Sequence, residues 1–437
     1  MIDAATAGPL AGLAGFAIVI LLVMLRLPVA IAMGVVGYIG LTLVSGTQTS
    51  GFMLARSAFE AAFPYSLSIV PLFIMMGVFA GRAGFSQSLY RFVAALVGHW
   101  RGGLAVATVG GCAIFGAISG SGIATTATMG RVALPEMRRH GYADSLATAS
   151  VAAGGTLGVI IPPSILFVIY GLATEQSIGK LFLAGVLPGL LGMLLYSLAV
   201  QVSVLRHPER GPAGERHDWH QRWQGFVAVW QVLLLFATVL GGLYMGWFSP
   251  TEAAAVGAFG ALLLALLGRR LSREAFFQGV SETALTSGMI FMILIGAGIF
   301  NAFIEASGLT DALIGFVAGL GWNRWAVLAA LMAAYIVLGA LMDELSMILL
   351  TVGPVFQLVL ALNFDPIWFG VMLITVCEIG MILPPVGINL FVIQASARVP
   401  MSTVVSGILP FAAVDVLRLL LLSLFPWLAT WLPSRMI

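Results

Sequence analysis

The chain has 437 residues, of which 60% are hydrophobic and only 9% are charged, and its formal net charge is +2. This composition excludes an ordinary soluble domain, and so small a net charge gives no reason to expect nucleic-acid binding. Its two cysteines are too few for a metal cluster of the usual four ligands. We therefore expect one all-α, polytopic membrane domain with no appended soluble domain.

The first hundred residues predict two membrane-spanning helices and two surface helices. The apolar segments 8–25 and 28–44 are long enough to cross a hydrocarbon core about 30 Å thick. The less hydrophobic segments 50–62 and 86–98 are typical of amphipathic helices that lie along the membrane interface. The amino terminus carries Asp3 and no cationic cluster, so it does not resemble a cleavable signal peptide.

The next segment, about 103–137, begins and ends beside arginines and has the sequence Ile118-Ser-Gly-Ser-Gly122 in its middle. We predict a re-entrant helical hairpin whose tip reaches the middle of the membrane. A helix at about 143–173 follows, and Pro162 and Pro163 break it. A proline inside a helix removes a backbone hydrogen bond and costs about 3 kcal/mol or more. In a bilayer such a break survives only where protein or a wet cavity surrounds it.

After a further span at 183–205 comes a polar linker at 206–222, and the second half then repeats the pattern. Its expected spans are 226–247, 253–268 and 403–417, and its expected amphipathic helices are 272–285 and 309–320. A second hairpin is predicted at about 325–361, with its tip near Gly339 to Ser346. A second broken helix is predicted at about 367–396.

The two halves also agree residue by residue. Gly158-Val-Ile-Ile-Pro162-Pro163 reappears 222 positions later as Gly380-Met-Ile-Leu-Pro384-Pro385. The other matched pairs include Pro28 with Pro250, Glu60 with Glu282, Gly84 with Gly308, and Pro188 with Pro410. We predict two repeats, 1–205 and 223–437. Matching broken helices in two halves of a membrane protein indicate an ion and substrate site, and therefore a transporter.

The distribution of charge predicts the orientation of the repeats, because short cytoplasmic loops collect Arg and Lys. The basic clusters are Arg26, Arg82 to Arg101, Arg131 to Arg139, 206–222, Arg269 to Arg273, and Arg398. The opposite set of loops contains Glu175, Glu252, Asp311 and Asp365. This pattern places the linker inside and the amino terminus outside, and the two repeats then have inverted topology.

The hairpin tip Ser119-Gly120-Ser121-Gly122 is the first candidate site. Serine hydroxyls and exposed carbonyls are hard oxygen ligands that suit Na⁺, although small residues also serve close helix packing in membranes. Asp343, Glu344 and Glu378 are the acids expected to lie deepest, and a charge at that depth indicates a functional site. For Asp343 and Glu378 a structural hydrogen bond to nearby helix ends is the alternative. Asp415 and Arg418 are expected to pair with each other.

Two other classes of protein remain to be weighed. Gly116-Ala-Ile-Ser-Gly120 could be the nucleophile motif of an intramembrane serine hydrolase, but that chemistry needs a nearby histidine base. The five histidines, His99, His140, His207, His217 and His220, all lie in or beside predicted loops. A channel is poorly motivated, because the sequence contains no ring of pore charges.

The chain resembles the large membrane subunit of TRAP (tripartite ATP-independent periplasmic) transporters over nearly its full length. The residues that carry the resemblance include Leu134-Pro-Glu-Met137, Gly154-Gly-Thr-Leu-Gly158, Ile161-Pro-Pro-Ser164, Thr174-Glu175, Pro188-Gly189, Glu378-x-Gly380, Pro384-Pro-Val-Gly387 and Asn389-Leu-Phe391. The resemblance implies an elevator-type fold and Na⁺-driven uptake of an organic acid across the bacterial inner membrane. It further implies a periplasmic binding protein, a small membrane subunit, and no organic cofactor.

By position, the resemblance implies two Na⁺ sites formed mostly by backbone carbonyls. The first would use Gly116, Ser119, Gly158, Ile161 and Pro163, and the second would use Gly339, Gly380, Leu383 and Val386. Many relatives have threonine where this chain has Leu383. The candidates for substrate contact are Ser121, Thr156, Ser164, Asp343, Glu378 and Asn389. The substrate class stays open between a C4-dicarboxylate, a sugar acid, sialic acid and another acid, and a self-sufficient Na⁺/carboxylate symporter remains the alternative.

Overall fold

The computed structural model describes residues 4–269, 271–384 and 386–436, and all the regular structure in these ranges is helical. The helices that precede the linker are α1 (Ala4–Met24), α2 (Val29–Ser45), α3 (Thr47–Ala62), η1 (Tyr65–Ser68), α4 (Ile69–Arg82), α5 (Phe85–Val97), α6 (Gly103–Ser119), α7 (Gly122–Arg139), α8 (Asp144–Ile160), α9 (Ile165–Ala173) and α10 (Ile178–Arg206). Those that follow are η2 (Pro208–Arg210), α11 (Trp219–Val227), α12 (Trp230–Tyr244), α13 (Pro250–Leu267), α14 (Arg273–Ala306), α15 (Leu309–Gly319), α16 (Arg324–Gly339), α17 (Glu344–Ala361), α18 (Pro366–Ile382), α19 (Ile388–Ala397), α20 (Met401–Leu424), α21 (Trp427–Thr430) and η3 (Pro433–Arg435).

The surface of the molecule is that of a membrane protein. Among the described helices, seven are long and apolar enough to cross a membrane, and α11 with α12, which meet at 53°, form an eighth span if they are counted as one. Large apolar side chains such as Leu43, Leu267 and Leu285 are more than 70% exposed. The exposure of so many large apolar side chains is unfavourable in water and is satisfied by hydrocarbon. The prediction of an all-α polytopic membrane protein is confirmed.

One predicted element is wrong. The segment 272–285 is not a separate amphipathic helix but the beginning of α14, which continues without a break for 34 residues. The first half does break at the equivalent place, because Pro64 separates α3 from η1 and α4. No proline occurs between Arg273 and Ala306, so nothing interrupts the backbone hydrogen bonds of α14. At 1.5 Å per residue this helix is about 51 Å long.

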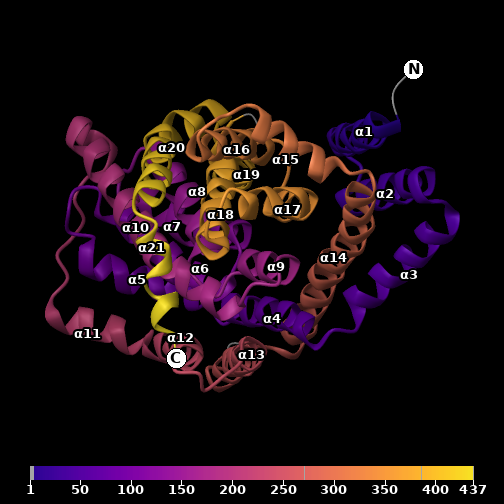
Figure 1. Ribbon diagram of the computed structural model, residues 1–437. Helices are drawn as coiled ribbons and strands as arrows, with labels where there is room; N and C mark the ends of the chain where they lie inside the picture. The colour runs from indigo at the N-terminus through magenta and orange to yellow at the C-terminus, as the bar shows by residue number, and fades with distance from the viewer. Residues whose placement is uncertain (1–3, 270, 385, 437) are drawn as a thin grey trace.

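The helices form a central group and a peripheral group (Figure 1). The helices α6 to α10 lie among α16 to α20 in the centre, although they are far apart in the sequence. Helix α14 runs diagonally beside this group, with α1, α2 and α3 beyond it, and α11, α12 and α13 follow the lower edge of the view. The core consists of closely packed apolar residues, and every residue of α8 from Leu146 to Ile160 is buried.

The predicted hairpins and broken helices correspond to four pairs of helices. The first hairpin consists of α6 and α7, which turn at Gly120 and Ser121, and the second consists of α16 and α17. The first broken helix consists of α8 and α9, which are separated by residues 161–164. The second consists of α18 and α19, which are separated by residues 383–387, and Pro385 within that break lies outside the described residues.

The two broken helices run in opposite directions. The hydroxyl of Tyr170, near the end of α9, donates to the carbonyl of Pro366 at the start of α18 at 2.7 Å. At the other end, the Arg138 guanidinium binds Asp144 at the start of α8 and donates to the carbonyl of Ala397 at the end of α19. Each broken helix therefore ends where the other begins.

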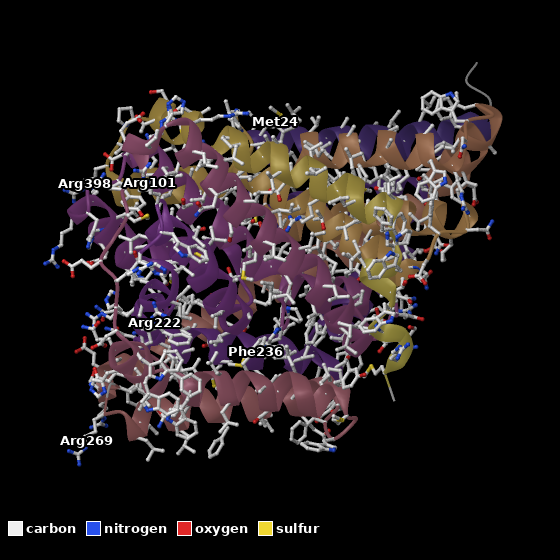
Figure 2. The ribbon with its side chains drawn as sticks, turned by 90° about the vertical axis from the view of Figure 1, so that its left-hand side faces the viewer. Met24, Arg101, Arg222, Phe236, Arg269 and Arg398 are labelled. Atoms are coloured by element: carbon white, nitrogen blue, oxygen red, sulfur yellow. The ribbon has the colours of Figure 1, made fainter. Side chains whose placement is uncertain are left out.

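Several of the basic loops gather at one end of the molecule. Figure 2 places Arg101, Arg222, Arg269 and Arg398 along the same edge, although Arg222 belongs to α11 and the other three come from three different connections. The first hairpin starts and ends at this edge, because Arg101 precedes α6 and Arg138 near the end of α7 reaches the residue before Arg398.

Candidate functional site

The first candidate ion site is centred on two glycines that bring α6 and α8 into backbone contact. A Cβ atom added to Gly116 would lie 2.4 Å from the Cα of Gly158, and one added to Gly158 would lie 2.9 Å from the Cα of Gly116. Carbon atoms in van der Waals contact are about 3.5–4.0 Å apart, so no larger residue fits at either position. The structure brings together the two glycines that the sequence predicted for this site.

Pro162 and Pro163 free oxygen atoms beside this contact. In an unbroken α8 the carbonyl of Gly158 would accept from residue 162, but a proline has no N–H to donate. The carbonyl of Val159 would accept from residue 163, which is also a proline and has no N–H. The hydroxyl of Ser164 donates to this carbonyl instead. The carbonyl of Gly158 therefore remains an oxygen atom without its helical donor, next to the hairpin tip.

The hairpin tip supplies further oxygen atoms. The hydroxyl of Ser119 lies 2.7 Å from that of Thr125 and 3.4 Å from the carbonyls of Gly116 and Ser121. Gly120 has a φ of +62°, which glycine adopts without strain, and so the chain can reverse here. A Cβ atom on Gly120 would lie 3.0 Å from the carbonyl oxygen of Pro163. The hairpin tip thus packs directly against the break in α8–α9.

Thr125 belongs to this cluster, and the sequence analysis did not single it out. Its hydroxyl would lie only 2.8 Å from a Cβ atom on Gly158, which places it against the glycine contact. It lies on α7, four residues after Ser121, so one helical turn brings it back over the tip. That spacing was the signal that could have identified it. Ile161 lies in the break itself, where its N–H donates to Leu157.

The second candidate ion site has the same glycine contact but fewer oxygen atoms. A Cβ atom on Gly380 would lie 2.7–2.9 Å from the backbone of Gly339. The carbonyl of Leu383 already accepts from the N–H of Gly387 at 3.0 Å, and Val386 is 38% exposed. The predicted residues Gly339 and Gly380 come together, whereas Leu383 and Val386 do not complete a comparable cluster.

Two methionines explain the difference between the sites. Met342 and Met347 occupy the positions that correspond to Ser119 and Thr125 in the first half. The sulfur of Met347 would lie 3.5 Å from a Cβ atom on Gly339, where the first site has a hydroxyl. Thioether sulfur is a soft ligand and suits Na⁺ poorly. The hard oxygen ligands are therefore concentrated in the first site.

A cavity of about 1030 Å³ lies against the first site and reaches the tip of the second hairpin. Its walls come from α4, α5, α6, α7, α9, α14 and α17. Its polar residues include Arg82, Ser119, Ser121, Arg131, Glu282, Asp343 and Glu344. The N-termini of three helices lie at its wall. Helix α7 contributes Ser121, Ile123 and Ala124, α9 contributes Ile165, and α17 contributes Asp343, Glu344 and Leu345. The first N–H groups of a helix have no partner within it and attract anions.

Four charged side chains of the cavity are arranged in different ways. The Arg82 guanidinium binds Glu282 at 2.8 Å and also donates to Gln278 at 3.1 Å. Arg131 is exposed on α7, and none of the described residues forms a salt bridge with it. Asp343 caps α17, accepting from the N–H of Ser346 at 3.0 Å and from its hydroxyl at 2.6 Å. The helix-cap alternative for Asp343 therefore applies, while its side chain still faces the cavity.

Of the predicted substrate contacts, only Ser121 and Asp343 line this cavity. Ser121 caps α7, accepting from the N–H of Ala124 at 3.3 Å. The remaining four candidates are buried elsewhere and bind protein groups: Thr156 to Ala153 and Tyr196, Ser164 to Val159, Asn389 to Ala152, and Glu378 to Arg418. We take those four as parts of the framework around the site.

Glu378 belongs to a buried ionic cluster, which we define as Glu378, Asp415, Arg418 and Tyr196. All four side chains are fully buried. The Arg418 guanidinium binds Glu378 and lies 3.0 Å from a carboxylate oxygen of Asp415, to which the Tyr196 hydroxyl donates. The expected contact between Asp415 and Arg418 is present, but the sequence analysis missed the bond from Arg418 to Glu378. Buried charges require such pairing, because burying a charge without a partner is costly.

Comparison with known proteins identifies the family. The family model of the tripartite ATP-independent periplasmic transporter, DctM component, matches residues 16–428. The chain belongs to this family. The C4-dicarboxylate TRAP transporter large permease protein DctM of Pseudomonas aeruginosa is 35% identical over 399 residues, which cover 90% of this chain and 92% of that protein. The isethionate TRAP transporter permease protein DctMQ of Oleidesulfovibrio alaskensis is 34% identical, covering 93% of this chain and 64% of that longer protein.

Solved structures support the fold of this DctM chain. The YdaH transporter of Alcanivorax borkumensis superposes with a TM-score of 0.59 at 17% identity, covering 87% of this chain and 89% of that one. At this identity the likeness concerns the fold alone. The curated relatives are named as transport permeases, so the prediction of a transporter is confirmed, and the hydrolase alternative is not supported.

Proposed function

We propose that this DctM chain takes up a small organic acid across the bacterial inner membrane, driven by Na⁺. A periplasmic binding protein delivers the substrate, and a small membrane subunit supports the non-moving helices. The observation that carries the proposal is the convergence of the N-termini of α7 and α9 on one cavity beside an oxygen-rich hairpin tip. Half-helix N-termini at a membrane midplane are suited to the anionic group of a substrate.

The Na⁺ part of the proposal rests on the first ion site. The carbonyl of Gly158 lacks a helical donor, and the hydroxyls of Ser119 and Thr125 lie 2.7 Å apart beside it. A bound Na⁺ would link α6, α7 and the broken helix α8–α9, and so order the wall that receives the acid. Each excess positive charge carried inward across 100 mV contributes about 2.3 kcal/mol. Two Na⁺ ions with a monoanion would therefore drive accumulation.

The mechanical part of the proposal is an elevator. We place the two hairpins and the two broken helices in one moving unit, together with α10 and α20, which the buried ionic cluster fastens to α8 and α18. The remaining spans form a scaffold, and residues 1–205 and 223–437 are inverted repeats joined by the linker 206–222. Opposite directions of the broken helices, fixed by the Tyr170–Pro366 and Arg138–Ala397 bonds, support the inversion. The shared edge of Arg101, Arg222, Arg269 and Arg398 supports a cytoplasmic location for that end and a periplasmic amino terminus.

The expected substrate is a small organic acid that fits within the cavity of about 1030 Å³. Relatives are named for C4-dicarboxylates, isethionate, sialic acid and ectoine. These compounds share a carboxylate or sulfonate group, which is the group that helix N-termini bind best.

Reconstitution tests the whole proposal. The complex of this chain with its small subunit is placed in proteoliposomes, and uptake of labelled acids is followed with and without the cognate binding protein and with inward, absent or outward Na⁺ gradients. We expect accumulation only with an inward Na⁺ gradient and added binding protein. Uptake that ignores the Na⁺ gradient would remove the coupling, and uptake without the binding protein would favour the self-sufficient symporter.

A further inference from the structure

The cavity contains one buried acid that neither the glycine contacts nor the helix caps use. Glu344, the first residue of α17, lines the cavity and is only 8% exposed. Its Oε2 atom is buried and has no hydrogen-bond partner among the described residues. A buried carboxylate oxygen without a partner is costly to the folded protein, so this oxygen atom indicates a place for a ligand.

The other two acids of the cavity are already occupied. Glu282 binds Arg82 at 2.8 Å, and Asp343 caps α17 through the backbone and hydroxyl of Ser346. Glu344 is thus the cavity carboxylate that combines burial with an unpartnered oxygen atom. The surroundings include the apolar residues Ile165 and Leu345, which offer it no hydrogen bond.

The neighbouring walls carry the opposite polarity. The N-termini of α7 and α9 lie at the same cavity, and Arg131 of α7 lines it without a salt bridge to a described residue. Helix N-termini and a guanidinium both attract an anionic group. A ligand in this cavity therefore meets donors on one side and a carboxylate on the other. An acid with no positive group would satisfy the donors and leave Glu344 facing another negative charge.

We propose that Glu344 binds a positively charged group of the substrate, so that this transporter carries a zwitterion: a carboxylate or sulfonate that also bears an ammonium or related cationic group. The inference rests on the proposed function and narrows its substrate class. The anionic group lies at the N-termini of α7 and α9, and the cationic group forms a charge-assisted pair with Glu344.

Matched pairs of probes test this inference on the purified chain with its small subunit. Taurine has an ammonium group where isethionate has a hydroxyl, and the two are otherwise the same. β-Alanine and 3-hydroxypropanoate form a second pair that differs in the same way. Each compound is titrated in NaCl while the midpoint of thermal unfolding is recorded. The variants are Glu344→Gln, Glu344→Asp and, as a control, Glu60→Gln, which changes an exposed carboxylate on α3 that pairs with Arg56.

We expect the ammonium member of at least one pair to stabilise the unaltered protein at a concentration at least tenfold lower than its hydroxyl partner. Glu344→Gln should abolish that difference, Glu344→Asp should retain it with weaker binding, and Glu60→Gln should leave it unchanged. The preference of the unaltered protein is measured without any variant, so a variant that fails to fold does not prevent the test.

Three results would overturn the inference. The first is a preference for the hydroxyl members, or no stabilisation by either ammonium compound. The second is an ammonium preference that persists in Glu344→Gln. The third result concerns Na⁺, whose stabilising effect is the difference in thermal midpoint between NaCl and N-methylglucamine chloride. If Glu344→Gln loses this effect while its response to the four probes is unchanged, Glu344 binds the metal ion and not the substrate. If the hydroxyl acids bind in the presence of Na⁺, the proposed function stands even when the inference about Glu344 fails. If neither the acids nor Na⁺ stabilise the protein, the inference and the proposed function both fail.

Discussion

Replacing Gly116 by alanine tests whether the glycine contact holds the ion site together. The new Cβ atom would lie 2.4 Å from the Cα and 2.9 Å from the N of Gly158. A normal carbon contact is about 3.5–4.0 Å, so α6 and α8 must separate by about 1 Å or more. Because both atoms of Gly158 belong to the backbone, no side chain can rotate away.

The expected cost of Gly116→Ala follows from this geometry. Overpacking of a well-packed interior costs about 1–3 kcal/mol, and alanine recovers about 0.5–1 kcal/mol over glycine within a helix. A net loss of about 1.4 kcal/mol, if it falls on the Na⁺-bound form, corresponds to about a tenfold weaker affinity. We therefore expect the Na⁺ concentration for half-maximal uptake to rise about tenfold.

Two variants serve as controls for Gly116→Ala. Gly288→Ala lies within α14 and has no atom within 4 Å of the added carbon, so it should stabilise the protein slightly and leave the Na⁺ dependence unchanged. Gly339→Ala, at the second site, meets its nearest atom at 3.3 Å and should have a milder effect than Gly116→Ala. An unchanged Na⁺ midpoint in Gly116→Ala would refute the reasoning, and so would an equal shift in Gly288→Ala.

Three further changes probe the site and its framework. Thr125→Val removes the hydroxyl that faces Ser119 and should raise the Na⁺ concentration for half-maximal uptake. Thr108→Val, whose hydroxyl donates to the carbonyl of Leu104 and to the sulfur of Met137, should not. Arg418→Met leaves two buried carboxylates without their cation and should lower the stability of the folded protein by about 3–5 kcal/mol, seen as loss of monodisperse protein in detergent. An Arg418→Met variant as stable as the unaltered protein would contradict the pairing of Arg418 with Glu378 and Asp415. Gly77→Ala would put a carbon 2.8 Å from the Cα of Ser119 and should lower the thermal midpoint, whereas Gly81→Ala, one turn further along α4 with its nearest atom at 3.7 Å, should lower it less.

The sequence predicted the helices best where a local chemical rule decides their ends. The double proline at Pro162 and Pro163 and the glycine at Gly120 force a break and a turn whatever their surroundings, and both occur where expected. Residues 272–285 were assigned by hydrophobicity and by analogy with the first half. The analogy failed because the second half has no counterpart of Pro64, and without a breaker the helix simply continues.

The side chains of the site were harder to predict, because their roles depend on contacts between distant parts of the chain. The four-residue spacing from Ser121 places Thr125 near the hairpin tip, but only the fold shows that its hydroxyl packs against Gly158. Glu378 looked like a candidate for substrate contact because it is an acid in an apolar helix. Arg418, forty residues further along the chain, binds it and makes it part of the framework. Pairings between distant helices of this kind require three-dimensional coordinates.

The buried ionic cluster has a consequence for motion. Its members come from α10, α18 and α20, and Thr156 of α8 extends it through the Tyr196 hydroxyl at 3.2 Å, so it fastens helices from both ends of the sequence to one another. Separating α18 from α20 would strand buried charges, and separating α10 or α8 would remove a hydrogen bond from the cluster. In the elevator that we propose, α8, α10, α18 and α20 therefore move together. The contact of Gly77 on α4 with Ser119 at the hairpin tip is then one place where the moving unit slides past the scaffold.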